Sequence, residues 1–367
     1  MNKLVVGNLV HRPLRSIISA LAVAIEVIMI LSIAAIMFGM LNGQKTRTSG
    51  IGMDMVAQPG TASNLIGVSG APASIKAGGV LLGLPHIKVA APVNIKLTGG
   101  ASLENIYGID FASYNALRAF TFLSGGPFNG PNDIILDDYA ANSDKKYNVG
   151  DKIEVLNHAF TVCGVVEHGK GGRKYIPIDT MGELIGTEGK ASAFYLKLDD
   201  PKNADVVKQE IKATPGLEQY IVQTTEELLS SLTPDKLPMF NVGLRVVIGI
   251  AVIIGFLVIF QSMYTAVMER TREIGILKSL GASRGYVVSV VLRESSLLAV
   301  CGIVLGISAT YLLQAILAVK FPKLDFSVTP GWVVTTIVIA FVGALLGALY
   351  PALKAARKDP IDALSYE

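Results

Sequence analysis

The chain has 367 residues, and its 51% hydrophobic and 17% charged residues are not the composition of a wholly soluble protein. Its formal net charge of +3 is too small to indicate nucleic-acid binding. One of its two cysteines, Cys163, lies in the central globular part and the other, Cys301, in an apolar stretch, so we predict no disulfide within the chain.

Four apolar stretches hold the excess of hydrophobic residues, and each is long enough to cross a hydrocarbon core of about 30 Å at about 1.5 Å per residue. A cleavable signal peptide fits the first stretch poorly, because a signal core has only about 7 to 15 apolar residues. The predicted order is an interfacial helix over 1–15, a span over 16–41, an external domain over 42–240, a span over 241–266, a cytoplasmic hairpin over 267–294, a span over 295–319, an external loop over 320–331, a span over 332–353 and a cytoplasmic tail over 354–367.

Basic residues near the spans predict the orientation, because lysine and arginine are retained on the cytoplasmic side. The short loop on the opposite side holds only Lys323 and is bordered by Lys320. Both termini and the hairpin are therefore predicted to be cytoplasmic, since they hold most of these residues: Lys3, Arg12, Arg15, Arg270, Arg272, Lys278, Arg284, Arg293, Lys354, Arg357 and Lys358.

An acidic residue, Glu26, lies inside the first predicted span. A charged group at membrane depth costs about 2.5 to 3.5 kcal/mol on insertion scales, so we expect it to face a neighbouring helix or a cavity. A functional role and a structural hydrogen bond to a neighbouring helix both remain open.

The external domain has the pattern of an α+β fold. Alternation and β-branched content predict strands over 54–58, 86–97, 105–109, 133–136, 152–156, 160–166 and 194–198. Helices are predicted over 204–213 and 225–231, the second capped by Thr224 or Thr225. Residues 60–79, rich in Gly, Ala and Ser, are predicted to form a mobile loop.

One segment of this domain resembles a phosphate-binding loop. Gly164, Gly169 and Lys170 satisfy most of the pattern G-x-x-x-x-G-K, but Gly171 stands where Ser or Thr must bind magnesium. The segment also continues a predicted strand and no capped helix follows. We therefore predict that it binds no nucleotide.

The hairpin between the second and third spans is more elaborate than a connection requires. Ile274 with Leu277 and Ile276 with Leu280 recur at helical spacing among charged residues, which predicts a short amphipathic helix. Gly281 is predicted to end this helix and Ser283 to cap the next one. We interpret the hairpin as a docking surface; the alternative is a charged hairpin lying on lipid headgroups.

Two pairs of glycines four residues apart, Gly302 with Gly306 and Gly343 with Gly347, lie in the third and fourth spans. Small residues at this spacing let helix backbones approach closely, so we predict tight helix packing at all four.

Three segments resemble one known family. Residues 269–283, ERTREIGILKSLGAS, are similar to the coupling helix of FtsX-like and MacB-like permeases, also called type VII ABC transporters. Residues 351–367, PALKAARKDPIDALSYE, are similar to that family's closing pattern P-A-x-x-A-A-x-x-D-P-x-x-A-L. Residues 132–138, NDIILDD, with the segments after them, resemble its periplasmic core domain. The resemblance covers nearly the whole chain.

This resemblance implies four transmembrane helices in a 1+3 arrangement and a large α+β extracytoplasmic domain with porter and sabre lobes. It also implies a dimer in the bacterial inner membrane, most simply a homodimer, with an ATPase bound to each copy. Whether a periplasmic adaptor also binds is left open by the resemblance. No ATPase motif is present, so we expect ATP and magnesium on a separate subunit and no cofactor or metal here. The residues expected to contact that ATPase are Glu269, Arg270, Arg272, Glu273, Ile274, Gly275, Leu277 and Lys278.

The predicted spans contain few charges and offer no evident aqueous path. We therefore expect mechanotransmission, in which ATPase closure moves the external domains and expels a hydrophobic or amphipathic substrate. The alternative is an FtsX-like signalling protein that regulates an extracellular partner without transport. The scattered histidines, His11, His86, His158 and His168, do not suggest an enzyme.

Overall fold

The computed structural model describes residues 13–60, 72–98, 104–142, 145–233, 238–321 and 324–357. The chain divides into two compact units, one formed by Met1–Met40 with Pro238–Glu367 and the other by Leu41–Leu237. The predicted interfacial helix over 1–15 and the tail over 354–367 lie mostly outside the described residues.

The first unit is a bundle of long helices, α2 (Pro13–Gly50), α9 (Pro238–Glu269), α11 (Arg284–Lys320) and α12 (Pro330–Arg357). All four are long and apolar enough to cross a membrane. Each is longer than the span predicted for it, and α2 continues nine residues beyond the predicted boundary at residue 41 without a break. The helices therefore extend beyond the apolar stretches that identify them in the sequence.

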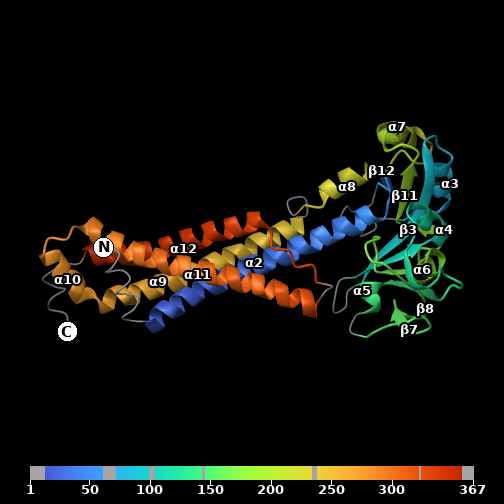
Figure 1. Ribbon diagram of the computed structural model, residues 1–367. Coiled ribbons are helices and arrows are strands. Elements are labelled where there is room, and N and C mark those ends of the chain that lie inside the picture. Colours follow the sequence, from blue (N-terminus) through green and yellow to red (C-terminus); the bar gives the residue numbers. More distant parts are fainter. Residues whose placement is uncertain are drawn as a thin grey trace. The chain divides into compact units, whose positions relative to one another are not determined.

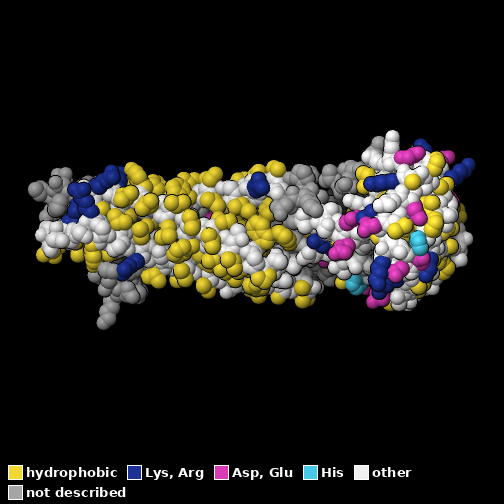
Figure 2. Space-filling view, turned by 90° about the horizontal axis from the view of Figure 1, so that it is seen from above, with side chains coloured by type: hydrophobic (Ala, Val, Ile, Leu, Met, Phe, Trp, Pro, Cys, Tyr) yellow, Lys and Arg dark blue, Asp and Glu magenta, His cyan; other side chains and the backbone are white. Residues whose placement is uncertain are grey.

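Helix α12 packs against both α9 and α11 (Figure 1). Its buried face carries alanines at helical spacing, Ala340, Ala344, Ala348 and Ala352, which bring the neighbouring backbones close. The opposite faces of the helices expose large apolar side chains. Figure 2 shows such side chains over most of this face of the bundle, with lysine and arginine gathered toward the end where Figure 1 places α10.

The four paired glycines differ in their surroundings. A methyl group on Gly302 would lie 2.6 Å from the carbonyl oxygen of Ala20 in α2, and one on Gly306 would lie 2.7 Å from Cβ of Val27. A methyl group on Gly347 would lie 2.9 Å from a carbonyl oxygen of α9, whereas one on Gly343 would meet no atom within 4 Å. Close helix approach therefore depends on three of these glycines.

Glu26 lies on the face of α2 that meets α9. Its side chain is 4% exposed, and its carboxyl group occupies the space that a side chain on Gly255 would need. Two turns away the hydroxyl groups of Ser19 and Ser262 are in contact. Glu26 is thus packed between two helices, and Gly255 makes room for it.

The second unit is built on a ten-stranded mixed sheet in the order β12-β1-β11-β3-β4-β9-β6-β8-β5, with β7 paired to β8. Its strands are β1 (Met55–Gln58), β3 (Ile87–Thr98), β4 (Glu104–Ile109), β5 (Phe122–Gly125), β6 (Asp133–Asp137), β7 (Lys152–Val155), β8 (His158–Val166), β9 (Lys174–Pro177), β11 (Ala193–Leu198) and β12 (Ile221–Thr224). A separate pair joins β2 (Ala73–Ser74) to β10 (Lys190–Ala191).

Helices cover this sheet: α3 (Lys76–Leu82), α4 (Phe111–Leu117), α5 (Asp138–Ala141), α6 (Ile178–Ile185), α7 (Ala204–Ala213) and α8 (Thr225–Ser231). At the end of the sheet that contains β1 and β11, the core includes Leu81, Val207 and Ile211 from α3 and α7. Around β6 and β8 the core includes Ala140 and Met181 from α5 and α6. The fold class expected from the sequence, membrane helices with a large α+β domain, is confirmed.

All seven predicted strands are present with bounds within two residues, and both predicted helices are confirmed. Thr224 caps α8 in a capping box with Glu227. The predicted mobile loop over 60–79 is wrong for 73–74, which form β2, and for 76–79, which belong to α3; residues 61–71 of it lie outside the described part.

Candidate functional site

The hairpin between α9 and α11 contains a short helix, α10 (Thr271–Ser279), as the apolar spacing predicts. Arg270 separates it from α9 by adopting a non-helical backbone conformation. Gly281 ends the helix region with a φ of +93°, and the Ser283 side chain accepts a hydrogen bond from the N–H of Tyr286 at the start of α11. The predicted glycine stop and serine cap are both confirmed.

The inner side of the hairpin is held by an ion pair. The Arg270 guanidinium lies 3.3 Å from the Glu294 carboxylate of α11, and the two side chains are only 12% and 10% exposed. Thr271, also buried, donates its hydroxyl to the carbonyl oxygen of Met268 at 2.8 Å. Removing one member of such a pair is costly, because the remaining charge stays buried and loses this partner.

Three more of the predicted contact residues also face the bundle. Ile274 packs against its core cluster, and Gly275 is buried. Lys278 donates a hydrogen bond of 3.0 Å from Nζ to the carbonyl oxygen of Ala356 near the end of α12. Together with Arg270, these residues attach α10 to α11 and α12.

The remaining predicted residues, Glu269, Arg272, Glu273 and Leu277, are exposed. Leu277 forms an apolar patch with two residues that were not among the predicted contacts, Ile276 and Leu280, and the three side chains are 36%, 45% and 80% exposed. The spacing of Ile276 and Leu280 was the signal that could have identified them. The hairpin thus presents an apolar patch bordered by charges of both signs.

In the second unit, the phosphate-loop-like segment receives the last turn of α2. The N–H of Gly171 donates a hydrogen bond of 2.9 Å to the carbonyl oxygen of Arg47, one of the last four carbonyl groups of that helix. Gly50 packs directly on the carbonyl group of Gly169, where no side chain would fit. Gly171 has a φ of +83°, and a methyl group there would lie 2.9 Å from the hydroxyl of Tyr114.

Lys170, the lysine of this segment, is 9% exposed and does not face solvent. Its amine donates to the carbonyl oxygens of Arg118 and Ala119 and lies 4.7 Å from the centre of the Phe120 ring. Burial, with the nearby charge of Arg118, lowers the pKa of Lys170 to about 8. No helix follows before β9, as the sequence predicts, and the lysine of this segment is held by backbone carbonyl groups of the domain itself.

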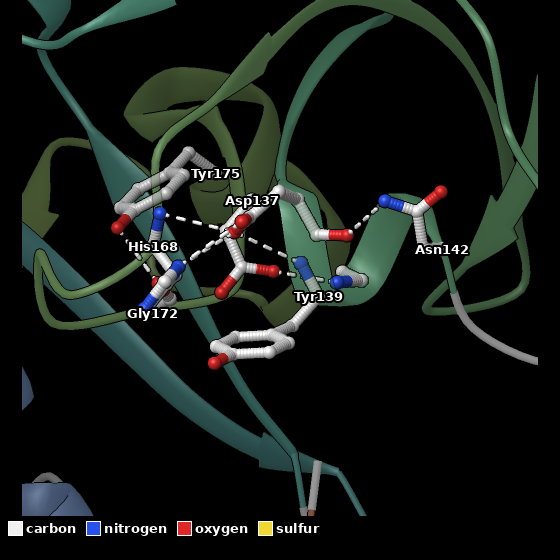
Figure 3. A network of polar contacts seen from close by, with 8 residues as sticks. Asp137, Tyr139, Asn142, His168, Gly172 and Tyr175 are labelled. Carbon is white, nitrogen blue, oxygen red and sulfur yellow. Dashed lines mark hydrogen bonds and ion pairs between the residues drawn. The ribbon is translucent and has the colours of Figure 1, made fainter. Parts of the chain in front are cut away.

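Figure 3 shows the polar network beside the same loop. Asp137 ends β6 and accepts a hydrogen bond of 2.6 Å from the N–H of Ala140 in α5. The Tyr175 hydroxyl donates to the Gly172 carbonyl oxygen at 2.7 Å, and the imidazole of His168 bonds Asp138 at 3.0 Å. Asp137 is 1% exposed, and this burial raises its pKa to about 6.

No cluster of three or more metal-ligating side chains occurs among the residues that the structure describes. The described histidines each bond a polar side chain: His86 contacts Asp199 at 2.8 Å, and His158 contacts Asn132 at 2.9 Å. These pairs join loops and strands of the second unit, and His11 lies outside the described residues.

Two family models match the chain. One described as MacB-like periplasmic core domain matches residues 16–214, and one described as FtsX-like permease C-terminal matches residues 245–360. The first therefore covers more than half of the chain.

Curated relatives include the uncharacterized ABC transporter permease YknZ of Bacillus subtilis, 32% identical over 239 residues, which are 61% of this chain and 58% of that protein. The uncharacterized ABC transporter permease MJ1507 of Methanocaldococcus jannaschii is 26% identical over 240 residues, 61% of this chain and 59% of that protein. The macrolide export ATP-binding/permease protein MacB of Rhodospirillum rubrum is 27% identical over 385 residues, 96% of this chain and 58% of that protein. The chain thus spans less than two thirds of each of these relatives.

Among solved structures, the periplasmic region of MacB from Actinobacillus actinomycetemcomitans has 16% identity and a TM-score of 0.39, and the match covers 52% of this chain and 95% of that one. The extracellular domain of YknZ has 15% identity and a TM-score of 0.37, over 47% of this chain and 98% of that one. On the two family models, the chain belongs to the MacB-like and FtsX-like family of ABC transporter permeases.

Proposed function

We propose that this chain is the permease subunit of an ATP-driven exporter that works by mechanotransmission. In this proposal a cytoplasmic ATPase binds the outer side of α10, and its closure displaces the hairpin. Helix α9 ends at the hairpin and α11 begins there, and the two helices carry that displacement across the membrane to external parts of the protein.

The two-sided construction of α10 supports the proposal. Its inner side is attached to the bundle by the Arg270–Glu294 ion pair and by Lys278, so a push on α10 acts on α11 and α12 rather than only bending a loop. Its outer side exposes Ile276, Leu277 and Leu280, an apolar patch of the kind that fills a pocket on a partner. The bordering charges would set the register of binding.

The composition of the assembly belongs to the same proposal. ATP and magnesium would bind to the ATPase, a second copy of the permease would complete a dimer, and a periplasmic adaptor would be an optional addition. Basic residues near the spans favour an orientation with α10 in the cytoplasm of a bacterial inner membrane. The macrolide-export relatives favour a hydrophobic or amphipathic substrate that is expelled on the external side.

The test is capture of the ATPase by the purified permease from native membranes. Changing Ile276 and Leu277 together to Asp adds two charges to the exposed patch and should reduce capture more than tenfold, because apolar anchors dominate such interfaces. The matched control is Ile276→Val with Leu277→Met, which changes the same two positions, keeps both apolar and should leave capture nearly unchanged. Undiminished capture by the Asp double variant would refute docking at this patch.

Transport and signalling are distinguished on the same complex. The FtsX-like family match keeps open a regulator that moves an extracellular partner without exporting anything. Substrate-stimulated ATP hydrolysis, lost in the Asp double variant and kept in Ile276→Val with Leu277→Met, is the result expected of an exporter. Stimulation only by a copurifying extracellular protein would favour the regulator.

A further inference from the structure

A hollow of about 370 Å³ lies beside the last turns of α12. Its lining residues, Tyr350, Leu353, Lys354 and Arg357, recur at spacings of three and four and therefore share one face of the helix. Among the residues that the structure describes, the lining combines two apolar or aromatic side chains with two cations and includes no acidic group. This is the composition of a site for a molecule with an apolar part and a negative charge.

A row of aromatic side chains adjoins the hollow on the neighbouring helix. Phe256, Phe260 and Tyr264 follow one another at every fourth residue of α9, with ring centres 6.1 and 6.0 Å apart. Tyr350 of α12 packs on Phe260 at 5.7 Å. All these side chains keep part of their surface exposed, so the row forms an aromatic strip along the seam between α9 and α12.

The strip ends at the two cations. Lys354 donates a hydrogen bond of 3.1 Å to the Tyr264 hydroxyl and lies 4.8 Å from the centre of that ring. An ammonium group has three donors, so this bond leaves two for a ligand. Arg357 ends the described helix one turn later, and its planar guanidinium can bind two phosphate oxygens at once.

From this juxtaposition we infer that the seam between α9 and α12 is a binding site for one anionic phospholipid. The phosphate lies between Lys354 and Arg357, and an acyl chain runs along Phe260 and Phe256. Helices α9 and α12 are both candidate membrane spans, so the strip faces acyl chains while the cations lie at a helix end. Free phosphate would use the cations and leave the aromatic strip without a role. The inference does not depend on an ATPase partner.

A tryptophan placed in the hollow reports on the lipid directly. The chain has a single tryptophan, Trp332, at the opposite end of α12. In a Trp332→Phe background, Leu353→Trp puts the only indole at the lining of the site. The full-length protein is reconstituted in phosphatidylcholine vesicles that contain a minor fraction of brominated phosphatidylglycerol or brominated phosphatidylcholine, and quenching gives the relative affinity of each lipid.

We expect the anionic lipid to bind at least about fivefold more strongly than the neutral one, the factor expected for one basic side chain at an anionic surface. Lys354→Gln with Arg357→Gln should bring the ratio to about one. The control removes two charges from exposed positions of α11, Arg284→Gln with Arg293→Gln, and should keep the preference. The site would be refuted if the indole showed no preference for the anionic over the neutral lipid. It would also be refuted if both double variants lost this preference equally. Displacement by millimolar inorganic phosphate would overturn the assignment to a lipid.

Discussion

The alanine variants of Gly302 and Gly343 should change the stability of the bundle in opposite directions. Both glycines begin a pair spaced by four residues, so the sequence pattern does not distinguish the two positions. A methyl group on Gly302 would lie 2.6 Å from an oxygen and a carbon of α2, whereas one on Gly343 would meet nothing within 4 Å. The same substitution therefore tests whether helix contact or the glycine itself matters.

The magnitude follows from these distances. Carbon atoms in ordinary contact are about 3.5 to 4.0 Å apart, so Gly302→Ala requires α2 and α11 to separate by about 1 Å. Overpacking of this kind costs about 1 to 3 kcal/mol, while replacing glycine by alanine inside a helix gains about 0.5 to 1 kcal/mol. We expect Gly302→Ala to lose about 1 to 2 kcal/mol of stability and Gly343→Ala to gain up to about 1 kcal/mol.

Trp332 makes the measurement possible without a label. It is the only tryptophan, and its ring lies 5.6 Å from that of Phe38 in α2, so its fluorescence reports the contact between α2 and α12. Titrating each purified variant with a denaturing detergent gives the unfolding midpoint and the free energy. If Gly302→Ala were as stable as the wild type, or if Gly343→Ala were equally destabilised, the close approach at Gly302 would not limit packing.

Three further changes test other parts of the structure. Burial raises the pKa of Asp137 to about 6, above the usual 3.8, so the folded state favours the protonated carboxyl group. The free energy of unfolding should therefore fall by up to about 3 kcal/mol as pH rises from 4 to 6. Thermal unfolding measured over this pH range should show the fall in the wild type and not in Asp137→Asn. Glu294→Met alone should cost about 3 to 5 kcal/mol of stability, because the Arg270 charge stays buried and loses this partner, whereas Arg270→Met with Glu294→Met should cost far less. A double-mutant cycle with the two single Met variants, followed by detergent unfolding, measures the difference. Gly171→Ala should be strained, because Gly171 has a φ of +83° and an added methyl group would crowd the Tyr114 hydroxyl. The variant should therefore speed amide hydrogen exchange in the last turn of α2. Unchanged exchange would show that the Gly171 loop does not stabilise this turn.

The sequence predicted seven strands of the external unit to within two residues. Strands β1, β6 and β11 are nearly continuous runs of buried residues, while others alternate between buried and exposed positions. Strand β7 shows this pattern throughout, and its predicted bounds differ from the observed ones by one residue. Strand β5 was missed because Phe122 is followed by three exposed residues, and no alternation identifies it. Helix α3 was missed because its glycines favour a loop when tertiary contacts are unknown.

The sequence predicted which residues form the candidate site on α10, but not which side of this helix faces the bundle. Helix α10 has apolar residues on two sides, and spacing alone cannot indicate which side meets the protein's own bundle. Ile274 packs against the core cluster of the bundle and Gly275 beside it is buried, whereas Ile276 is 45% exposed. Only the packing of α10 on α11 and α12 separates these two roles.

The division of α10 into an attached side and an outward side bears on how inactivating mutations in this hairpin can be interpreted. A lesion at Gly275 would distort the permease internally, and no compensating change in another polypeptide could repair it. Ile276 is exposed, so on the proposed docking a lesion there leaves the fold of the permease intact, and second-site suppressors should arise in the gene of the ATPase. Suppressor genetics starting from that one residue can thereby lead to the binding protein.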